Sequence, residues 1–336
     1  MRFTINTIFK LVIVFGMIHF TGCSLAHKIL RPTGIVSMPL EEIIPKYSTP
    51  FSHFIDIDGT IVHYCDEGQG PVLLLLHGVA SSIHTWNNWT EILRDKYRLI
   101  RIGVPGFGLT GPIASDNYSK EEWVRILNLF VEKLHLDRFS LAGNSMGGFI
   151  GWNFAIAYPD KIDKLILIDP VAYPQPCPWI FNLVSLPLVG TIAKYITPKF
   201  LIDYNVKEVY GDVNKISNST YERYFDMAMR PGNRESYVKI FQLMKSKSSS
   251  EIYSQNIRHI KAPVLLMWGT EDRWVPMTLI DKWKNDIPHI SVITYPGVGH
   301  VPMEEIPYIT ARDAHKFLSG CELLLAQSKK DGTKMP

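Results

Sequence analysis

The sequence predicts an α/β protein with a mostly parallel, doubly wound sheet. Apolar runs of strand length alternate with helix-length amphipathic stretches along most of the chain. Runs that are apolar on both faces, such as residues 72–76, are typical of parallel strands covered by helices on both sides. A chain of 336 residues with 46% hydrophobic residues can bury a large core. One large domain with an insertion is therefore expected, rather than several small domains.

The first 22 residues are expected to be a signal peptide. Arg2 and Lys10 precede the apolar run 11–20, which is too short to span a bilayer but suits the hydrophobic region of a signal peptide. The segment is therefore left out of the fold.

Cys23 follows the signal-type run directly. The sequence Phe20-Thr-Gly-Cys23 resembles the lipobox of bacterial lipoproteins, which implies lipidation of Cys23 and attachment to a membrane. Ser24 replaces the aspartate associated with inner-membrane retention, so the resemblance implies the outer membrane of a bacterial cell envelope. An ordinary secretory peptide cleaved nearby, or a buried cysteine, is the alternative. Residues 23–51 carry four prolines and are expected to form a tether.

Residues 52–170 are expected to form the first part of the core. A hairpin at the sheet edge is predicted around the turn Asp58-Gly59. A glycine-rich loop follows the strand 99–102. The expected strands and helices after the hairpin are 72–76, 83–96, 99–102, 121–134, 138–143, 146–158 and 164–168.

The alternation stops after the sixth core strand. Residues 171–256 are proline-rich and then helical, with no strand returning to the sheet, which predicts a helical cap over the cleft. Residues 257–320, with strands 264–268 and 291–295, complete the core. Residues 321–336 are expected to be a polar tail.

Ser145 is the candidate nucleophile. It lies in Gly143-Asn-Ser-Met-Gly147, between a predicted buried strand and a helix that stops at Pro159. In a G-x-S-x-G turn the glycines leave room for a cramped backbone that pushes the serine hydroxyl into the cleft. A structural glycine-rich turn with an unreactive serine is the alternative, and the surrounding pattern favours the catalytic interpretation.

His300 and Asp272 are the candidate base and acid. His300 lies in a glycine-flanked loop after the last strand, and Asp272 follows the preceding strand. A base that accepts the serine proton and an acid that orients the base are what acyl transfer requires. Asp169 also ends a strand next to the site and is the competing candidate for the acid. Its expected role is instead to accept hydrogen bonds from backbone N–H groups at its own turn.

Four motifs in this order make the chain from about residue 54 to 318 similar to the α/β-hydrolase superfamily. The resemblance implies an oxyanion hole formed by the backbone N–H groups of Val79 and Met146, and a structural role for His77. Gly-Asn-Ser-Met-Gly-Gly together with Asp-Arg-Trp-Val-Pro resembles bacterial lipases and carboxylesterases. The same motifs occur in hydrolases that cleave carbon–carbon bonds of ring-fission products. The fold implied is the α/β-hydrolase fold with a helical cap after the sixth core strand.

The resulting expectation is a serine hydrolase that cleaves carboxylic esters, with medium-chain acyl groups held by Trp179 and Phe181. Its partners would be a small ester or lipid substrate and the membrane that holds the anchor. No nucleic acid is expected, because 35 basic and 32 acidic residues are spread along the chain. No cofactor is implied, and the four cysteines lack metal-type spacing. A hydrolase of meta-cleavage type dienoic acids, or a non-catalytic binding protein of the same fold, is the alternative.

Overall fold

The computed structural model describes residues 30–250 and 254–320. The expected signal peptide 1–22, Cys23 and the tail 321–336 lie outside these residues. Within the described chain, no helix combines the length and the apolar character needed to cross a membrane.

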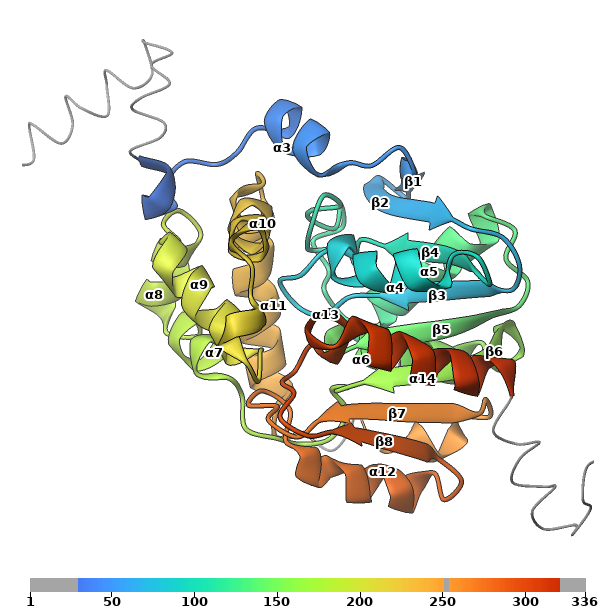
Figure 1. Ribbon diagram of the computed structural model, residues 1–336. Coiled ribbons are helices and arrows are strands. Elements are labelled where there is room, and N and C mark those ends of the chain that lie inside the picture. Colours follow the sequence, from blue (N-terminus) through green and yellow to red (C-terminus); the bar gives the residue numbers. More distant parts are fainter. Residues whose placement is uncertain (1–29, 251–253, 321–336) are drawn as a thin grey trace, which may run out of the picture.

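The core is an eight-stranded sheet with the order β1-β2-β4-β3-β5-β6-β7-β8 (Figure 1). The first two neighbouring pairs, β1 with β2 and β2 with β4, are antiparallel, and the pairs that follow in this order are parallel. The α/β-hydrolase fold expected from the sequence is confirmed. The strands are β1 (Ser52–Ile57), β2 (Thr60–Glu67), β3 (Val72–Leu76), β4 (Arg98–Ile102), β5 (Phe139–Asn144), β6 (Ile162–Ile168), β7 (Val264–Gly269) and β8 (Ser291–Tyr295).

The central strands are buried because helices cover both faces of the sheet. Helices α4 and α14 contact each other on the near face in Figure 1, and α5 and α6 contact each other behind the sheet. Trp89 of α4 donates to Thr310 Oγ1 of α14 at 2.9 Å. The core helices are η2 (Ile83–Trp86), α4 (Asn87–Leu93), α5 (Lys120–Lys133), α6 (Met146–Ala157), η3 (Pro159–Lys161), η6 (Ile257–His259), η7 (Met277–Leu279), α12 (Ile280–Asp286), α13 (Pro302–Glu305) and α14 (Pro307–Ser319).

The structure shows why two of the sequences predicted to be helical form helices. Ser119 caps α5 by accepting a hydrogen bond from the N–H of Glu122, and two acidic residues occupy the first turn of that helix. Helix α6 is apolar on all sides because it is buried, with Trp152 and Phe154 inaccessible to solvent.

Helices replace strands between β6 and β7, where the cap is expected. They lie together at the end of the sheet where the parallel strands finish (Figure 1). Their stretches of apolar residues face the core and one another. The cap helices are α7 (Trp179–Val184), α8 (Pro187–Ala193), α9 (Lys199–Glu208), η4 (Val213–Lys215), α10 (Asn218–Met229) and α11 (Asn233–Lys247).

The expectation of a free tether is wrong for residues 30–51. This segment forms η1 (Arg31–Thr33) and α3 (Leu40–Tyr47), and Ile43 of α3 is buried against Met227 of the cap. The buried carboxylate of Asp226 accepts hydrogen bonds from Lys46 Nζ at 2.6 Å and Tyr47 Oη at 2.8 Å, and it also pairs with Arg31. A proline-containing stretch is therefore held against the cap by apolar packing of α3 and by a buried acid of α10.

Candidate active site

Ser145 occupies the turn between β5 and α6. Its backbone has φ 54° and ψ −116°, a strained conformation for a residue with a side chain. The N–H of Ser145 donates to Ile168 O at 2.9 Å, and its carbonyl accepts from Phe149 N at 3.0 Å and Val171 N at 3.2 Å. Hydrogen bonds on both sides of the turn thus hold the strained serine in position.

The glycines of the motif are required by space. A Cβ on Gly143 would lie 2.4 Å from the carbonyl oxygen of Gly147, and one on Gly147 would lie 2.3 Å from the carbonyl oxygen of Leu76. Both contacts involve backbone atoms that cannot move aside. The turn could not close around Ser145 with larger residues at these two positions.

His300 and Asp272 form a hydrogen-bonded pair. His300 Nδ1 lies 2.7 Å from Asp272 Oδ2, and the Asp272 side chain is fully buried. Asp272 Oδ1 accepts from the N–H groups of Trp274 at 2.7 Å and Val275 at 2.9 Å. With this carboxylate fixed, His300 carries its proton on Nδ1 and leaves Nε2 as an acceptor.

The free nitrogen of His300 faces the same cavity as Ser145. Nε2 is buried and has no hydrogen-bond partner among the described residues. Both Ser145 and His300 line the cavity described below. Trp274 packs beside the imidazole with a centroid separation of 5.8 Å. A buried, unpaired acceptor next to the candidate nucleophile is what a general base needs.

Asn144 positions the histidine loop, and the sequence analysis did not single it out. Its Nδ2 donates to the carbonyl oxygens of His300 at 3.0 Å and Ile168 at 3.1 Å. The N–H of His300 in turn donates to Val209 O in the cap at 2.8 Å. The residue immediately before the nucleophile thus connects the serine turn to the histidine loop.

Glu305 is a second residue that the sequence analysis missed. Its carboxylate accepts from the N–H groups of Gly299, Gly211 and Asp212, each at 2.9 Å. One buried acid therefore joins the residue before His300 to the cap. Its signal in the sequence is the pair Glu304-Glu305, which stands close after the histidine in an otherwise apolar turn.

Of the two expected oxyanion donors, Val79 lines the cavity, and Met146 directly follows Ser145 in the chain. Met146 N is the first amide of α6, where backbone N–H groups have no partner within the helix. Neither N–H has an acceptor within residues 30–250 and 254–320. The helix N-terminus adds partial positive charge at this point, which suits a developing oxyanion.

Asp169 is not bonded to the imidazole. It is fully buried at the end of β6, where Oδ1 accepts from Gly269 N at 2.9 Å and Oδ2 has no partner in the described chain. Burial, and then the negative charge of Asp272, raise the pKa of Asp169 well above its usual value. The negative form of Asp169 is therefore disfavoured at this buried position.

Asp169, Asp272 and His300 are also the described group whose donor atoms are close enough for a metal ion, within 4.8 Å of one another. The three partners already bonded to Asp272 account for its oxygens. We therefore interpret these three residues as the hydrogen-bonded pair of His300 and Asp272 with Asp169 buried beside it, and not as a metal site.

His77 is occupied by backbone hydrogen bonds. Nδ1 donates to Gly78 O at 2.8 Å, and Nε2 accepts from Val104 N at 2.9 Å. Complete burial lowers the pKa of His77 to about 4. The ring is therefore a neutral bridge between two loops.

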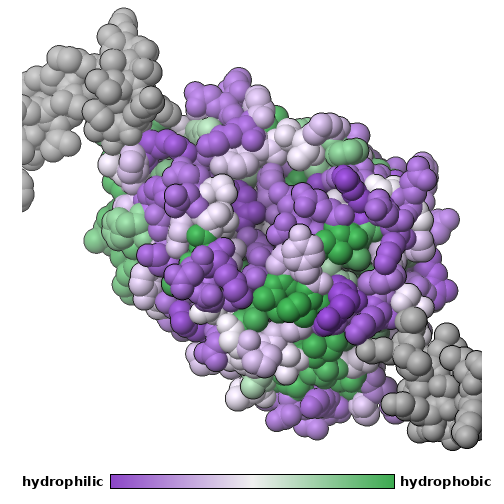
Figure 2. All heavy atoms as spheres, viewed as in Figure 1, coloured by the Kyte–Doolittle hydropathy of each residue, from purple (hydrophilic) through white to green (hydrophobic). Residues whose placement is uncertain are grey.

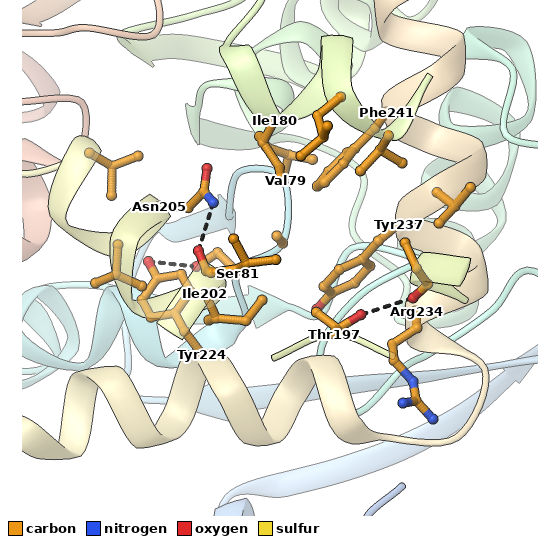
Figure 3. Close-up of a pocket in the computed structure, with 18 of the residues that line it drawn as sticks. Val79, Ser81, Ile180, Thr197, Ile202, Asn205, Tyr224, Arg234, Tyr237 and Phe241 are labelled. Carbon is orange, nitrogen blue, oxygen red and sulfur yellow. Dashed lines mark hydrogen bonds between the residues drawn. The ribbon is translucent and has the colours of Figure 1, made fainter. Parts of the chain in front are cut away.

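A cavity of about 320 Å³ extends from Ser145 between the core and the cap. Its walls are aliphatic and aromatic, and polar groups are few. Figure 3 shows Ile180 and Phe241 pointing into it from the cap, and Tyr224 hydrogen-bonded to Ser81 across it at 3.4 Å. Its lining from the cap includes Ile180, Leu183, Val184, Val189, Ile192, Leu201, Ile202, Val206, Tyr237, Val238 and Phe241.

Trp179 and Phe181, which were expected to hold the acyl group, are not among the residues that line this cavity. Trp179 is 37% exposed and contacts Tyr204 edge-on at 5.5 Å. Phe181 is buried behind the wall, where it stacks on Phe241 at 4.4 Å. The side of α7 that faces the cavity carries Ile180 instead, with Leu183 and Val184 one turn further on.

A buried ion pair joins the cap to the core next to the site. Arg223 Nη2 donates to Glu304 Oε2 at 2.7 Å, and the hydroxyls of Tyr210 and Tyr224 donate to the same carboxylate at 2.9 and 3.1 Å. Thr85 donates to it as well. Burial tends to raise the pKa of Glu304, but the charge of Arg223 and these hydrogen bonds outweigh it, and the pKa is lowered.

The comparisons with known proteins agree with this fold. A model of the α/β hydrolase fold family matches residues 71–185. A solved structure of a membrane phospholipase A, described as a bacterial virulence factor, aligns with a TM-score of 0.66 at 23% identity and covers 95% of this chain and 98% of its own. The chain therefore has the α/β-hydrolase fold.

Two curated relatives extend over most of the chain. The cis-3-alkyl-4-alkyloxetan-2-one decarboxylase of Shewanella oneidensis is 25% identical over 83% of this chain and 92% of its own length. The 2-hydroxy-6-oxo-6-phenylhexa-2,4-dienoate hydrolase of Burkholderia cepacia is 27% identical over 71% and 84%. Together with the site, these matches support a hydrolase of the α/β-hydrolase superfamily. The relatives' names fit the dienoic-acid alternative of the sequence analysis better than its main interpretation as an esterase.

Proposed function

We propose that the protein is a serine hydrolase that cleaves carboxylic esters with apolar acyl chains through an acyl-enzyme on Ser145. The observation that carries this proposal is that Ser145 and His300 line the same apolar cavity. The free Nε2 of His300 and the strained Ser145 stand at one end of an aliphatic chamber of about 320 Å³.

Acylation begins with proton transfer from Ser145 Oγ to His300 Nε2 as Oγ attacks the ester carbonyl carbon. The carbonyl oxygen becomes an oxyanion, which the N–H groups of Val79 and Met146 stabilise. Asp272 stabilises the imidazolium through Nδ1. Collapse of the tetrahedral intermediate expels the alcohol, which takes the proton from Nε2.

Deacylation repeats these steps with water. His300 Nε2 takes a proton from water, the hydroxide attacks the acyl carbon, and Ser145 leaves with the proton that Nε2 returns. The carboxylic acid is released, and the site regains its starting protonation state.

The cavity wall favours apolar acyl chains over charged substrates. Each methylene buried against it contributes roughly 0.8 kcal/mol of binding until the chamber is full. Among the described residues that line the cavity, Arg234 and His300 are the ones with basic side chains. The guanidinium of Arg234 is already bonded to Tyr195 O at 2.7 Å and Ser37 Oγ at 2.8 Å.

Hydrolysis of meta-cleavage type dienoic acids is the second candidate. Several curated relatives are named as such hydrolases, at 26 to 29% identity. A dienoate brings a carboxylate that needs a cationic partner when buried. The engagement of Arg234 with backbone oxygens is the reason that we place this candidate second.

The two candidates are separated by assaying one preparation on p-nitrophenyl esters from acetate to palmitate and on a 2-hydroxy-6-oxo-dienoate. The ester proposal expects catalytic efficiency to rise from acetate toward medium chains, with no detectable dienoate cleavage. Efficient cleavage of the dienoate with negligible ester turnover would reverse the order. Failure of a fluorophosphonate probe to label the protein, with neither substrate turned over, would indicate a binding protein.

We also propose that Cys23 is lipidated and attaches the protein to the outer membrane of a bacterial cell envelope. The apolar run 11–20 and the lipobox-like Phe20-Thr-Gly-Cys23 support this proposal. The variant Cys23→Ser should leave the membrane fraction and lose incorporation of labelled palmitate. Undiminished labelling of that variant would refute the anchor.

A further inference from the structure

The cap carries a group of large apolar side chains that face solvent. We call this group the cap face. Leu188 is 74% exposed, and Tyr195 and Phe200 are each 67% exposed. In Figure 2 apolar residues gather at the left edge of the molecule, where Figure 1 places α8 and α9. The cap face consists of Leu188, Ile192, Tyr195, Ile196, Phe200 and Tyr204.

The cap face is continuous with the wall of the catalytic cavity. Ile192 and Ile196 are 46% and 41% exposed, yet both also line the cavity that contains Ser145. Ile192 and Ile196 therefore belong both to the exposed cap face and to the wall of the cavity. Isolated exposed apolar residues are ordinary, but a cluster at a cavity entrance indicates an interaction surface.

The described chain also begins beside the cap face. Thr197 N donates to Gly34 O at 3.2 Å, and Arg234 binds the carbonyl oxygens of both Gly34 and Tyr195. The 29 preceding residues, which include the apolar run 11–20, join the described chain at Leu30, directly before η1. A membrane-attached N-terminus would hold this side of the cap toward the bilayer.

Charges around the cap face are paired. Lys199 Nζ lies 2.8 Å from Asp203, and Lys194 Nζ lies 3.9 Å from Glu235. The aromatic rings of Tyr195 and Tyr204 combine an apolar body with a polar tip, which is favourable at the interface between lipid and water. These features favour a zwitterionic lipid surface over an anionic one.

We infer that the cap face is a membrane-docking surface that opens the catalytic cavity toward the lipid phase. Leu188 and Phe200 enter the interfacial layer, and the passage between Ile192 and Ile196 delivers an apolar substrate from the bilayer to Ser145. The delivery step rests on the proposed ester hydrolysis, whereas the docking step does not.

Docking and delivery are tested with full chains that carry Cys23→Ser, so that the proposed lipid anchor cannot hold any variant on the membrane; in these experiments, wild type means this chain without further changes. The docking step uses phosphatidylcholine vesicles. The double variant L188E/F200E replaces two members of the cap face, neither of which lines the cavity. The matched control is Y308E/I309E on α14, where Tyr308 and Ile309 are 76% and 44% exposed on another side of the molecule. Vesicle flotation should fall at least about tenfold for L188E/F200E, since burial of each side chain contributes at least that factor. The control should float like the wild type, and salt should have little effect.

Hydrogen exchange with and without vesicles locates the contact. Vesicles should slow amide exchange in residues 186–208 of the wild type and leave residues 307–319 unchanged. If exchange in residues 186–208 is unchanged, or L188E/F200E floats like the wild type, the inference is overturned. Slow exchange there before vesicles are added would instead mean that residues 1–29 cover the cap face.

A second copy of the chain is the remaining alternative occupant. A wild-type dimer in analytical ultracentrifugation that L188E/F200E converts to monomer, without vesicle binding by either, would overturn the inference.

The delivery step is measured separately. L188E/F200E should hydrolyse a dissolved octanoate ester at the wild-type rate and a vesicle-borne ester at least about tenfold more slowly. Equal rates of the variant and the wild type on the vesicle-borne ester would refute delivery through the cap face. Absence of turnover by the wild type on both esters would contradict the proposed function, whereas docking is decided by flotation and exchange.

Discussion

Asp272 and Asp169 stand side by side at the histidine, but only Asp272 bonds to it, through Oδ2 at 2.7 Å from His300 Nδ1. Asp272→Asn should therefore lower kcat by about three to four orders of magnitude, because the amide disturbs the tautomer and cannot stabilise the imidazolium. Steady-state kinetics on p-nitrophenyl octanoate measure the loss. Near-normal turnover in this variant would remove Asp272 from the triad.

Asp169→Asn is the matched control, with a much smaller expected effect. An amide oxygen can still accept from Gly269 N, and a neutral amide removes a negative charge that burial and Asp272 disfavour, as the raised pKa of Asp169 shows. We expect kcat within about threefold of wild type, since the residue contacts no reacting atom. A larger loss than in Asp272→Asn, in a folded protein, would reverse the assignment of the acid.

The same substitution should change how stability depends on pH. Because the pKa of Asp169 is higher in the folded protein than its ordinary 3.8, the folded state binds the proton more tightly. Wild type thus loses stability as pH rises from that value to the raised pKa. Asp169→Asn should gain relative stability across this window, as measured by urea unfolding at several pH values. A constant difference would show that Asp169 does not titrate as described.

The pair Arg223 and Glu304 should stabilise the docking of the cap. Arg223→Met leaves a buried carboxylate without its cation, which costs roughly 3 to 5 kcal/mol of unfolding free energy. Because the pKa of Glu304 is lowered, this contribution is present above its ordinary 4.5 and is lost as pH falls through the lowered value. The exposed pair Arg138 and Asp163, 3.0 Å apart, provides the control, and Arg138→Met should cost about 1 kcal/mol or less. Equal costs in chemical denaturation would contradict the assigned role.

Two neighbouring residues of α9 allow the cavity wall to be tested against the outer surface of the cap. Leu201 lines the cavity, whereas Phe200 points to solvent. Leu201→Trp fills part of the chamber and should lower efficiency on octanoate at least about tenfold relative to acetate, since several methylenes lose their contacts. Phe200→Trp should keep the wild-type profile of chain length. Identical profiles for both variants would place the acyl chain elsewhere.

The sequence was sufficient for the sheet and for the motif residues because both depend on local patterns. An apolar run such as residues 72–76 fits a buried strand of a parallel sheet. The glycines around Ser145 fit the tight strand-to-helix turn of the G-x-S-x-G motif. The histidine and its acid could be paired because the loops after neighbouring parallel strands meet at one edge of the sheet. These inferences need no knowledge of the long-range packing.

Other features depend on contacts between distant segments. The arm 30–51 resembles a tether because of its prolines, and its docking depends on Asp226 and Met227, about 180 residues away in the chain. The position of Ile180 on the cavity side of α7 could not be derived from the sequence, because a helix as short as α7 does not show which of its faces is buried. Asn144 and Glu305 bind backbone groups, so the sequence does not show which partners they have, even where the pair Glu304-Glu305 stands out in an apolar turn.

The central claim is that Ser145 carries the acyl group. Rapid quenching of the protein with p-nitrophenyl octanoate, followed by peptide mass spectrometry, tests it directly. Wild type should show an octanoyl adduct on the peptide that contains Ser145, and Ser145→Ala should show no adduct and no turnover while unfolding like the wild type. Ester turnover at the wild-type rate by Ser145→Ala, or an adduct confined to another residue, would contradict the claim.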